Sequence, residues 1–148
     1  MNASPSPAVA AAEFGYDLAI ASRRWRRALD DTLARYDLSD ASWRPLLHLD
    51  RIGDGARQSD LAQSLGIEGP SLVRLLDRLA TAGLLERRED PSDRRAKTLH
   101  LTDAGLAAVA RLRTVVAAAC ADMLEGVTED EIAVCRRVLA RVAERARR

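Results

Sequence analysis

The chain has 148 residues, a formal net charge of +1, and a composition that is 47% hydrophobic but only 3% aromatic. This length accommodates one domain with an oligomerisation element, and the Ala- and Leu-rich composition favours a mainly helical protein. Two cysteines, Cys120 and Cys135, are too few for a disulfide scaffold and lack metal-site spacing, which excludes those two protein classes.

Residues 1–8 are small, polar and contain proline, so we predict a disordered N-terminus. They lack the basic stretch of a secretory signal, and no later run appears long and apolar enough to span a bilayer. We therefore expect a cytoplasmic protein with no membrane partner. Apolar side chains recur at mostly helical spacing over residues 9–36 and again over residues 40–51, so each of these segments predicts a helix.

Two short helices on either side of a glycine turn follow. Residues 58–65 predict the first helix, with Ser59 as its N-cap. Gly66 supplies the turn, and Pro70 lies in the first turn of a further helix that runs to residue 82. This arrangement is typical of a helix-turn-helix.

The hydrophobic period changes after Gly83. Residues 84–88 and 96–101 each predict a β-strand, and the polar segment 89–95 predicts the turn between them. A β-hairpin that directly follows a helix-turn-helix is a wing.

Two helices complete the chain. Thr102 is the predicted N-cap of a helix that ends at Gly126, and Thr128 and Glu131 predict a capping box at the start of another. Both helices carry apolar stripes that a small winged-helix domain alone does not cover, so a second subunit is the expected partner. The predicted fold class is mainly α (α+β), a winged helix-turn-helix with long N- and C-terminal helices that form a dimerisation domain.

The helix from residue 70 to 82 has the pattern of a recognition helix. Its leucines share one face, which leaves the other side of its N-terminal half to enter the major groove of DNA. The side chain of Arg74 suits a guanine or a phosphate, and Val73 suits a thymine methyl group. The candidate DNA-binding residues in the helix-turn-helix are Ser59, Pro70, Ser71, Val73, Arg74 and Arg78. The alternative is an ordinary solvated helix face.

The predicted wing tip carries the remaining DNA-binding candidates, Asp93, Arg94, Arg95 and Lys97. An arginine at such a tip suits the narrow minor groove of A·T tracts. Asp93 is expected to pair with a neighbouring arginine and fix its direction. The alternative is a solvated, charged turn.

The run "LAQSLGIEGPSLVRLLDRLATAGLLERREDPSDRRAKTLHLTDAG", from Leu61 to Gly105, resembles the MarR family of transcriptional regulators. The pieces "GIEGPSLVRLLDRL" and "DRRAK" are similar to its SlyA-like branch in particular. The resemblance implies a homodimer that binds a pseudo-palindromic operator in double-stranded DNA. It implies repression as the default, or activation by displacing silencing proteins. Residues 9–36 and 103–148 would then be dimerisation helices, and residues 37–102 the DNA-binding lobe.

The resemblance also implies release from DNA by a small aromatic carboxylate or phenol, bound between the dimer helices and the DNA-binding lobe. By position, Arg23, Arg26, Trp43 and His48 resemble pocket residues. Arginine holds a carboxylate, an indole stacks on a ring, and histidine adds a hydrogen bond. The alternatives are a core or interface role for Trp43, a solvated face for the two arginines, and a polar network for His48.

The sequence does not favour an enzyme. Its two histidines, His48 and His100, fall on separate elements, and it has no nucleophile elbow, phosphate loop or HExxH motif. We predict no cofactor and no metal. Redox-sensing relatives carry a cysteine near the start of the first helix, whereas Cys120 and Cys135 fall in apolar stripes and are predicted to be buried hydrophobes. The rival function is a winged helix that binds protein without binding DNA.

Overall fold

A computed structural model describes residues 6–36 and 40–146, although not the side chains of Pro7, Asp40, Ala41, Ser42 and Arg94. The mainly helical winged helix-turn-helix fold with long terminal helices is confirmed. In chain order the elements are α1 (Pro7–Ala34), α2 (Asp40–Ile52), β1 (Ala56–Arg57), α3 (Gln58–Leu65), α4 (Gly69–Thr81), β2 (Leu85–Asp90), β3 (Asp93–Leu101), α5 (Asp103–Met123) and α6 (Glu129–Arg145).

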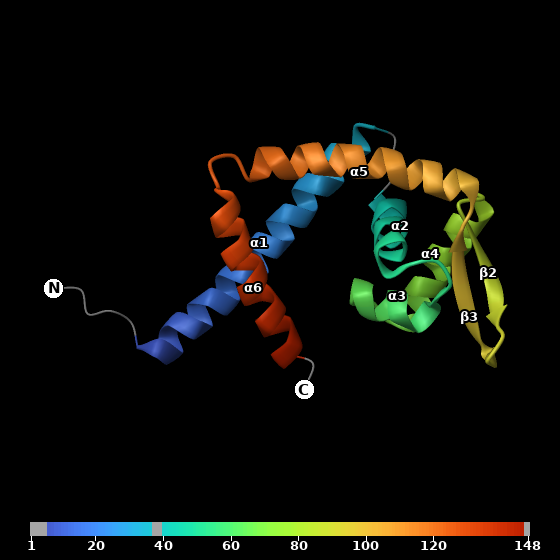
Figure 1. Cartoon of the computed structure of the whole chain (residues 1–148), viewed down its shortest axis with the longest axis horizontal. Helices are drawn as coiled ribbons and strands as arrows, with labels where there is room; N and C mark the ends of the chain where they lie inside the picture. The colour runs from blue at the N-terminus through green and yellow to red at the C-terminus, as the bar shows by residue number, and fades with distance from the viewer. Residues whose placement is uncertain (1–5, 37–39, 147–148) are drawn as a thin grey trace.

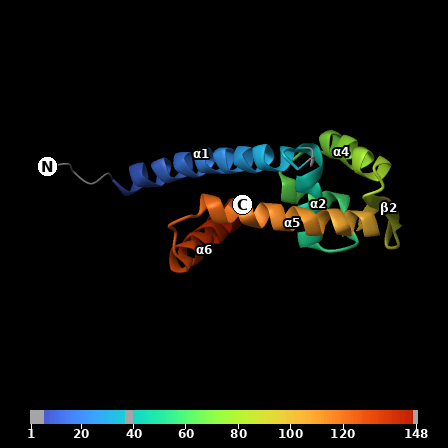
Figure 2. The ribbon, with the colours of Figure 1, turned by 90° about the horizontal axis from the view of Figure 1, so that it is seen from above.

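The elements form two groups that α5 connects (Figure 1). The helices α2, α3 and α4 and the small sheet gather at the N-terminal end of α5. Along its other half, α5 runs beside α1, as the view from above also shows (Figure 2). From the end of α5, α6 turns back at an angle to that helix (Figure 1), and none of its residues is buried. The helix-turn-helix and wing are thus carried at one end of a long helical arm.

Side-chain caps fix the starts of the two C-terminal helices as predicted. At α5, Thr102 Oγ1 accepts a hydrogen bond from the Gly105 N–H at 3.0 Å. At α6, Thr128 and Glu131 form the expected capping box, in which each side chain accepts from the other residue's backbone N–H. These bonds satisfy donors that a helix leaves open in its first turn.

Two N-terminal boundaries differ from the prediction. Ser59 is not the N-cap of α3, because the helix already begins at Gln58 and the cap residue is Arg57, whose N–H donates to Asp60 Oδ2 at 3.1 Å. Of the segment 1–8 that we predicted to be disordered, residues 1–5 lie outside the described residues, whereas α1 begins at Pro7 with Ser6 as its cap.

The sheet is antiparallel with the order β1-β3-β2. Strand β1 was not predicted, because two residues carry no periodic pattern. The hairpin is also longer than predicted, so Asp93–Arg95 belong to β3 and the turn contains only Pro91 and Ser92. Hydrophobic alternation marks only the half of a hairpin that packs on a core, and the distal half of this wing is charged and exposed.

Leucines dominate the core around the helix-turn-helix, as the low aromatic content requires. Side chains from α1, α2, α3, α4, both hairpin strands and α5 meet there. Those with an exposed fraction of 1% or less are Leu33, Leu49, Leu61, Leu72, Leu76, Leu79, Leu99 and Leu112. The core thus joins the start of α5 and the end of α1 to the helix-turn-helix.

The expectation that no segment could span a bilayer by length and composition is wrong for α5. This helix has 21 residues and a mean hydropathy of 1.5 over its most apolar window. Many alanines raise that mean, although individually they are only weakly apolar. However, Ala108, Val109 and Leu112 pack in the core, and Arg113 pairs with Asp50 of α2 at 2.5 Å. A core helix passes the same test, so α5 alone is weak evidence of a membrane segment.

Candidate nucleic-acid interface

The recognition-helix candidate, α4, rests on its leucines. Leu72, Leu76 and Leu79 are at most 1% exposed, because residues three and four apart share one face of a helix. The predicted contact residues on the rest of the helix are all exposed, namely Pro70, Ser71, Val73, Arg74 and Arg78. This is the presentation that a helix needs in order to read a major groove.

An ion pair joins α4 to the wing. Asp77, on the exposed side of α4, pairs with Arg87 of β2. The arginine offsets a carboxylate that would otherwise repel DNA phosphates. Sequence reasoning named neither residue as functional, because nothing in the local pattern pairs a helix with a strand ten residues away.

At the start of β3, Asp93 contacts the backbone of a nearby arginine. Its Oδ1 accepts a hydrogen bond from the backbone N–H of Arg95 at 3.0 Å, and the described side chains include no ion pair to Asp93. The Arg94 side chain lies outside the described residues. Arg95 is exposed, and Lys97 Nζ lies 3.3 Å from Glu89 Oε1 in an exposed pair that holds the ammonium only weakly.

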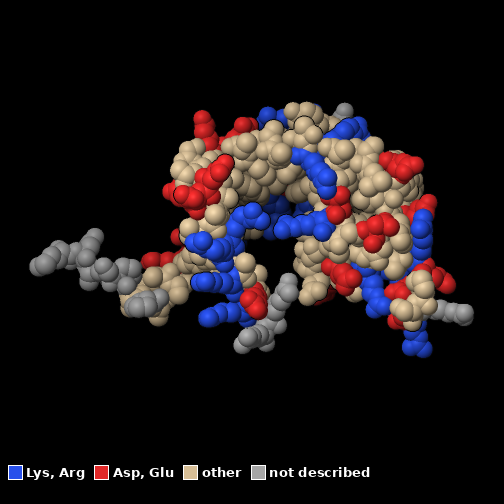
Figure 3. Space-filling view, viewed as in Figure 1, with Lys and Arg blue, Asp and Glu red and all other residues tan. Residues whose placement is uncertain are grey.

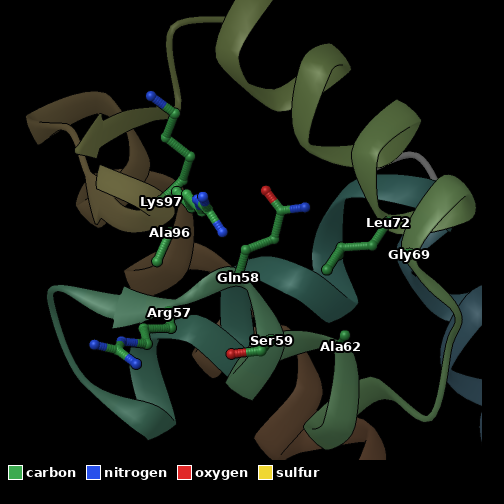
Figure 4. Close-up of a pocket in the computed structure, with 9 residues that line it drawn as sticks. Arg57, Gln58, Ser59, Ala62, Gly69, Leu72, Ala96 and Lys97 are labelled. Atoms are coloured by element: carbon green, nitrogen blue, oxygen red, sulfur yellow. The ribbon is translucent and has the colours of Figure 1, made fainter. Parts of the chain in front are cut away.

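A cavity of about 360 Å³ separates β3 from the N-terminal ends of α3 and α4 (Figure 4). Of the predicted residues it brings together Ser59, Arg95 and Lys97. It also includes Gln58, which was not predicted and whose side chain points into the space between β3 and α4. Cationic and hydrogen-bonding side chains beside two helix N-termini suit the DNA backbone.

Three more of the predicted residues form a second patch along α4. Ser71, Arg74 and Arg78 share a shallow depression with Asp77. Most of the predicted DNA-binding residues are therefore divided between the face of α4 and the gap between α4 and the wing, whereas Asp93 lines neither patch. Both patches are on the helix-turn-helix and wing, and the two together are the candidate interface.

A buried carboxylate at the wing tip was missed. Asp90 is 7% exposed and is the one buried charged residue in the described part of the chain. Its Oδ2 lies 2.8 Å from Arg57 Nε, while its Oδ1 accepts from the Ser92 N–H at 2.8 Å and from the Ser92 hydroxyl at 2.6 Å. The local signal that could have identified it is the Asp-Pro-Ser sequence, which is typical of a turn in which aspartate bonds the backbone two residues on.

Hydrogen bonds from Ser92 and then the charge of Arg57 lower the pKa of Asp90 from 3.8 to about 2. The carboxylate is therefore ionised across the physiological range. Because the folded-state pKa is depressed, the stabilisation is complete above the ordinary pKa and is lost as the pH falls through about 2.

Trp43 and His48, two of the effector candidates, are held in contacts within the chain. Trp43 is 7% exposed and its indole N–H donates to Asp30 Oδ1 at 2.9 Å, which agrees with the core alternative. His48 Nδ1 lies 2.7 Å from Ser64 Oγ, between α2 and α3. Burial, followed by nearby arginine charges, lowers the pKa of His48, so this imidazole is neutral at pH 7.

The other two candidates, Arg23 and Arg26, are exposed on α1. Arg26 Nη2 lies 3.5 Å from Ser22 Oγ on the same helix. In the described part of the chain, no hydrogen bond or ion pair links either arginine to Trp43 or His48. The four residues therefore do not form a connected site in this single chain.

Charge is unevenly spread over the molecule despite the small net value. Figure 3 shows basic side chains gathered over α6 and at the free end of the wing, with acidic side chains on the lobe between them. A near-neutral protein that binds DNA needs cations concentrated at the DNA interface, and of these two clusters only the one on the wing belongs to the candidate interface.

The cysteines differ in environment. Burial raises the pKa of the Cys120 thiol, whereas Cys135 is exposed on α6 and not buried in this chain as predicted, because α6 packs on little of its own subunit. The raised pKa lowers the thiolate fraction of Cys120, the form that reacts with peroxide. In the described residues, no group of three or more His, Cys, Asp or Glu side chains is placed to hold a metal ion.

We expect that replacing Cys120 or Cys135 with serine leaves the response of DNA binding to peroxide unchanged. The reason is that Cys120 is a poor nucleophile at neutral pH and neither residue has a thiol neighbour in the described chain. DNA-binding titrations before and after peroxide treatment, on wild type and both variants, measure this. A peroxide-dependent loss of binding that disappears in either variant would contradict it.

The chain is similar to known proteins over most of its length. A family model described as MarR family matches residues 36–96. The structure of the transcriptional regulator PA3341 is 43% identical with a TM-score of 0.82, and the match covers 90% of this chain and 98% of that one. A structure of MarR is 30% identical with a TM-score of 0.68, over 90% of this chain and 96% of that one. A MarR-family regulator from Rhodococcus sp. RHA1 is 24% identical with a TM-score of 0.80, over 95% and 96% of the two chains, which is a likeness of fold.

Proposed function

Because this chain belongs to the MarR family of transcriptional regulators, we propose that it regulates transcription as a homodimer that binds a pseudo-palindromic operator. The single observation that carries this proposal is the position of α4. Its leucines are buried, its arginines are exposed, and the arginine and lysine of β3 lie beside its N-terminus. A major-groove helix with an adjacent minor-groove wing accounts for all three features.

The C-terminal helix supports the homodimer. No residue of α6 is buried in the single chain, yet Val134, Val138, Leu139 and Val142 form an apolar stripe with exposed fractions of 39–47%. A second copy that covers this stripe and the exposed parts of α1 and α5 would remove it from water. We assign residues 9–36 and 103–148 to the dimerisation helices and residues 37–102 to the DNA-binding lobe.

We further propose that the protein belongs to the SlyA-like branch, acts as a repressor by default, and works in the cytoplasm at the nucleoid. The pieces "GIEGPSLVRLLDRL" and "DRRAK" support the branch. A small aromatic carboxylate or phenol is the proposed effector class. Its support is the family resemblance and the exposed Arg23 and Arg26, because Trp43 is buried and bonded to Asp30.

The deciding experiment is a fluorescence-anisotropy titration of the full chain at two salt concentrations. The probes are the fragment upstream of its own gene and a duplex selected by the protein from a random library. Sequence-selective binding that falls steeply with salt supports the proposal, because each neutralised phosphate contributes about −0.9 to the slope of log affinity against log salt. Release of the duplex by salicylate tests the effector class.

Arg95→Ala is expected to weaken binding to the selected duplex by about 1–3 kcal/mol, the range of one good contact in a DNA groove. Arg95 is exposed at the wing and lines the cavity beside α4. The matched control is Arg111→Ala, which removes an exposed arginine from α5, outside the wing. Equal affinities for wild type and Arg95→Ala would remove this residue from the DNA-binding mechanism.

The alternative function is a winged helix that binds a protein partner without DNA. It predicts no selected duplex and no steep salt dependence. The exposed cations of both α4 and β3 favour DNA, because a protein-binding wing does not require them.

A further inference from the structure

The distal half of the wing has almost no apolar packing. Residues 86–89 of β2 are exposed, as are Asp93, Arg95 and Lys97 on β3. A two-stranded ribbon without a packed face is only marginally stable in water. Something other than a core must therefore hold this part of the wing at a defined angle.

The buried carboxylate of Asp90 is placed to do so. It lies at the end of β2, where the strand register shifts, and Ser92 follows in the turn. Arg57 reaches both residues: its Nε lies 2.8 Å from Asp90 Oδ2, and its Nη2 lies 3.2 Å from Ser92 Oγ. Because Oδ1 accepts from Ser92, both carboxylate oxygens are used, and one guanidinium contacts both Asp90 and Ser92.

Arg57 belongs to the helix-turn-helix side of the interface. It is the last residue of β1 and the N-cap of α3, and its N–H donates to Asp60 Oδ2 at 3.1 Å. Its backbone thus starts α3 while its side chain holds the wing tip. Arg57 also lines the cavity between β3 and the N-termini of α3 and α4, together with Arg95 and Lys97.

We propose that Arg57, Asp90 and Ser92 form a positioning clasp that fixes the angle of the wing against the helix-turn-helix, and so sets where β3 meets DNA. This inference rests on the proposed function. The clasp residues act through Arg95 and Lys97, by keeping the gap between β3 and α4 at the width of the cavity. Sites of this kind lose affinity when their supporting residues are removed, even though the contacting residues remain.

The clasp and simple electrostatics predict opposite changes in DNA affinity when Asp90 is neutralised. Asp90 is an anion beside a surface proposed to meet phosphates, so its charge alone should weaken DNA binding. Removing that charge should then leave the affinity unchanged or raise it. If the carboxylate positions the wing, Asp90→Asn lowers the affinity instead, because Arg57 loses its partner and the wing loses its attachment.

The test uses the full chain and the duplex that wild type selects from a random library. We expect Asp90→Asn to weaken binding about tenfold or more, and hydroxyl-radical footprints to lose protection in the minor grooves flanking the half-sites. Major-groove protection of guanine N7 under α4 should persist. Glu86→Gln is the matched control, since it neutralises an exposed carboxylate on the same strand, and it should keep both footprints.

A double-mutant cycle separates positioning from direct contact. If Arg57 acts through Asp90, Arg57→Gln weakens binding in the wild-type background and has little further effect beside Asp90→Asn. If Arg57 holds a phosphate directly, its loss is the same in both backgrounds, and the clasp is wrong. Arg57→Lys keeps a cation for Asp90 but lacks the forked guanidinium that also reaches Ser92. We therefore expect its minor-groove protection to lie between that of wild type and that of Arg57→Gln.

Circular dichroism and thermal unfolding establish that each variant is folded. If Asp90→Asn does not fold, Ser92→Ala provides the same test, because it removes one hydroxyl and should still reduce the flanking protection. Unchanged affinity and footprints in a folded Asp90→Asn or Ser92→Ala protein overturn the clasp alone. Failure of wild type to select any duplex overturns the proposed function, and the clasp with it.

Discussion

Joint replacement of Val138 and Val142 by glutamate is expected to convert the proposed dimer into a monomer and to lower operator affinity about 100-fold or more. Both valines lie on the apolar stripe of α6, which is exposed in the part of the chain that the structure describes. Two unpaired carboxylates in a subunit interface carry a large desolvation cost. A monomer binds one half-site at a time and loses the effective concentration that links the two, a factor of about 10²–10⁴.

Sedimentation equilibrium measures the subunit mass, and anisotropy measures the affinity for the selected duplex. The matched control replaces the same two valines with leucine, which keeps the stripe apolar and should preserve both the dimer and its affinity. A dimer that survives the two glutamates would place the subunit interface elsewhere. Full affinity in a monomeric variant would show that pairing of half-sites is not part of binding.

Gly105→Ala is expected to be the most destabilising single substitution, at about 3 kcal/mol or more. A Cβ at residue 105 would lie 2.0 Å from the carbonyl oxygen of Leu84 and 3.3 Å from Leu101 Cδ2. The Leu84 carbonyl cannot give way easily, because it also accepts the Thr102 N–H at 3.2 Å. The methyl group would therefore push the start of α5 away from the turn that follows α4.

Urea unfolding at a fixed protein concentration measures the effect, since a dimer's stability depends on concentration. Gly69→Ala is the control: Gly69 begins α4, and a Cβ there would meet nothing within 4 Å. That variant should differ from wild type by at most about 1 kcal/mol. Equal losses of stability in the two variants would show that helix propensity, and not the contact with Leu84, decides the outcome at residue 105.

Local patterns sufficed to predict the helices, because apolar period and capping are encoded within a few residues. The capping box of Thr128 and Glu131 and the leucine face of α4 both appear as predicted. Elements that depend on contacts between residues far apart in the chain were missed. Strand β1 exists only because it pairs with β3, and the distal wing is a strand without an apolar face.

The same distinction applies to the candidate site. Sequence spacing identified the exposed arginines and serine of α4, since the opposite face is marked by leucines. Spacing could not identify Arg57, because the proposed role of this side chain depends on its ion pair with Asp90, which lies 33 residues later. It assigned Asp93 to a neighbouring arginine side chain; the structure shows a hydrogen bond from the Arg95 backbone N–H to this carboxylate, and the Arg94 side chain lies outside the described residues.

The packing of α5 at both of its ends has a consequence for the spacing of the half-sites that a dimer can bind. Its first half is packed in the leucine core and held to α2 through Arg113 and Asp50, while its second half runs beside α1 toward the proposed subunit interface. In the proposed dimer, this helix would therefore set the distance between the two recognition helices. Inserting one residue at its middle would turn one end relative to the other by about 100° and advance it about 1.5 Å. The spacing and phase of the half-sites would then depend on a helix outside the proposed DNA-binding lobe, and changes to α5 would alter which operators fit while every proposed DNA-contacting side chain stays the same.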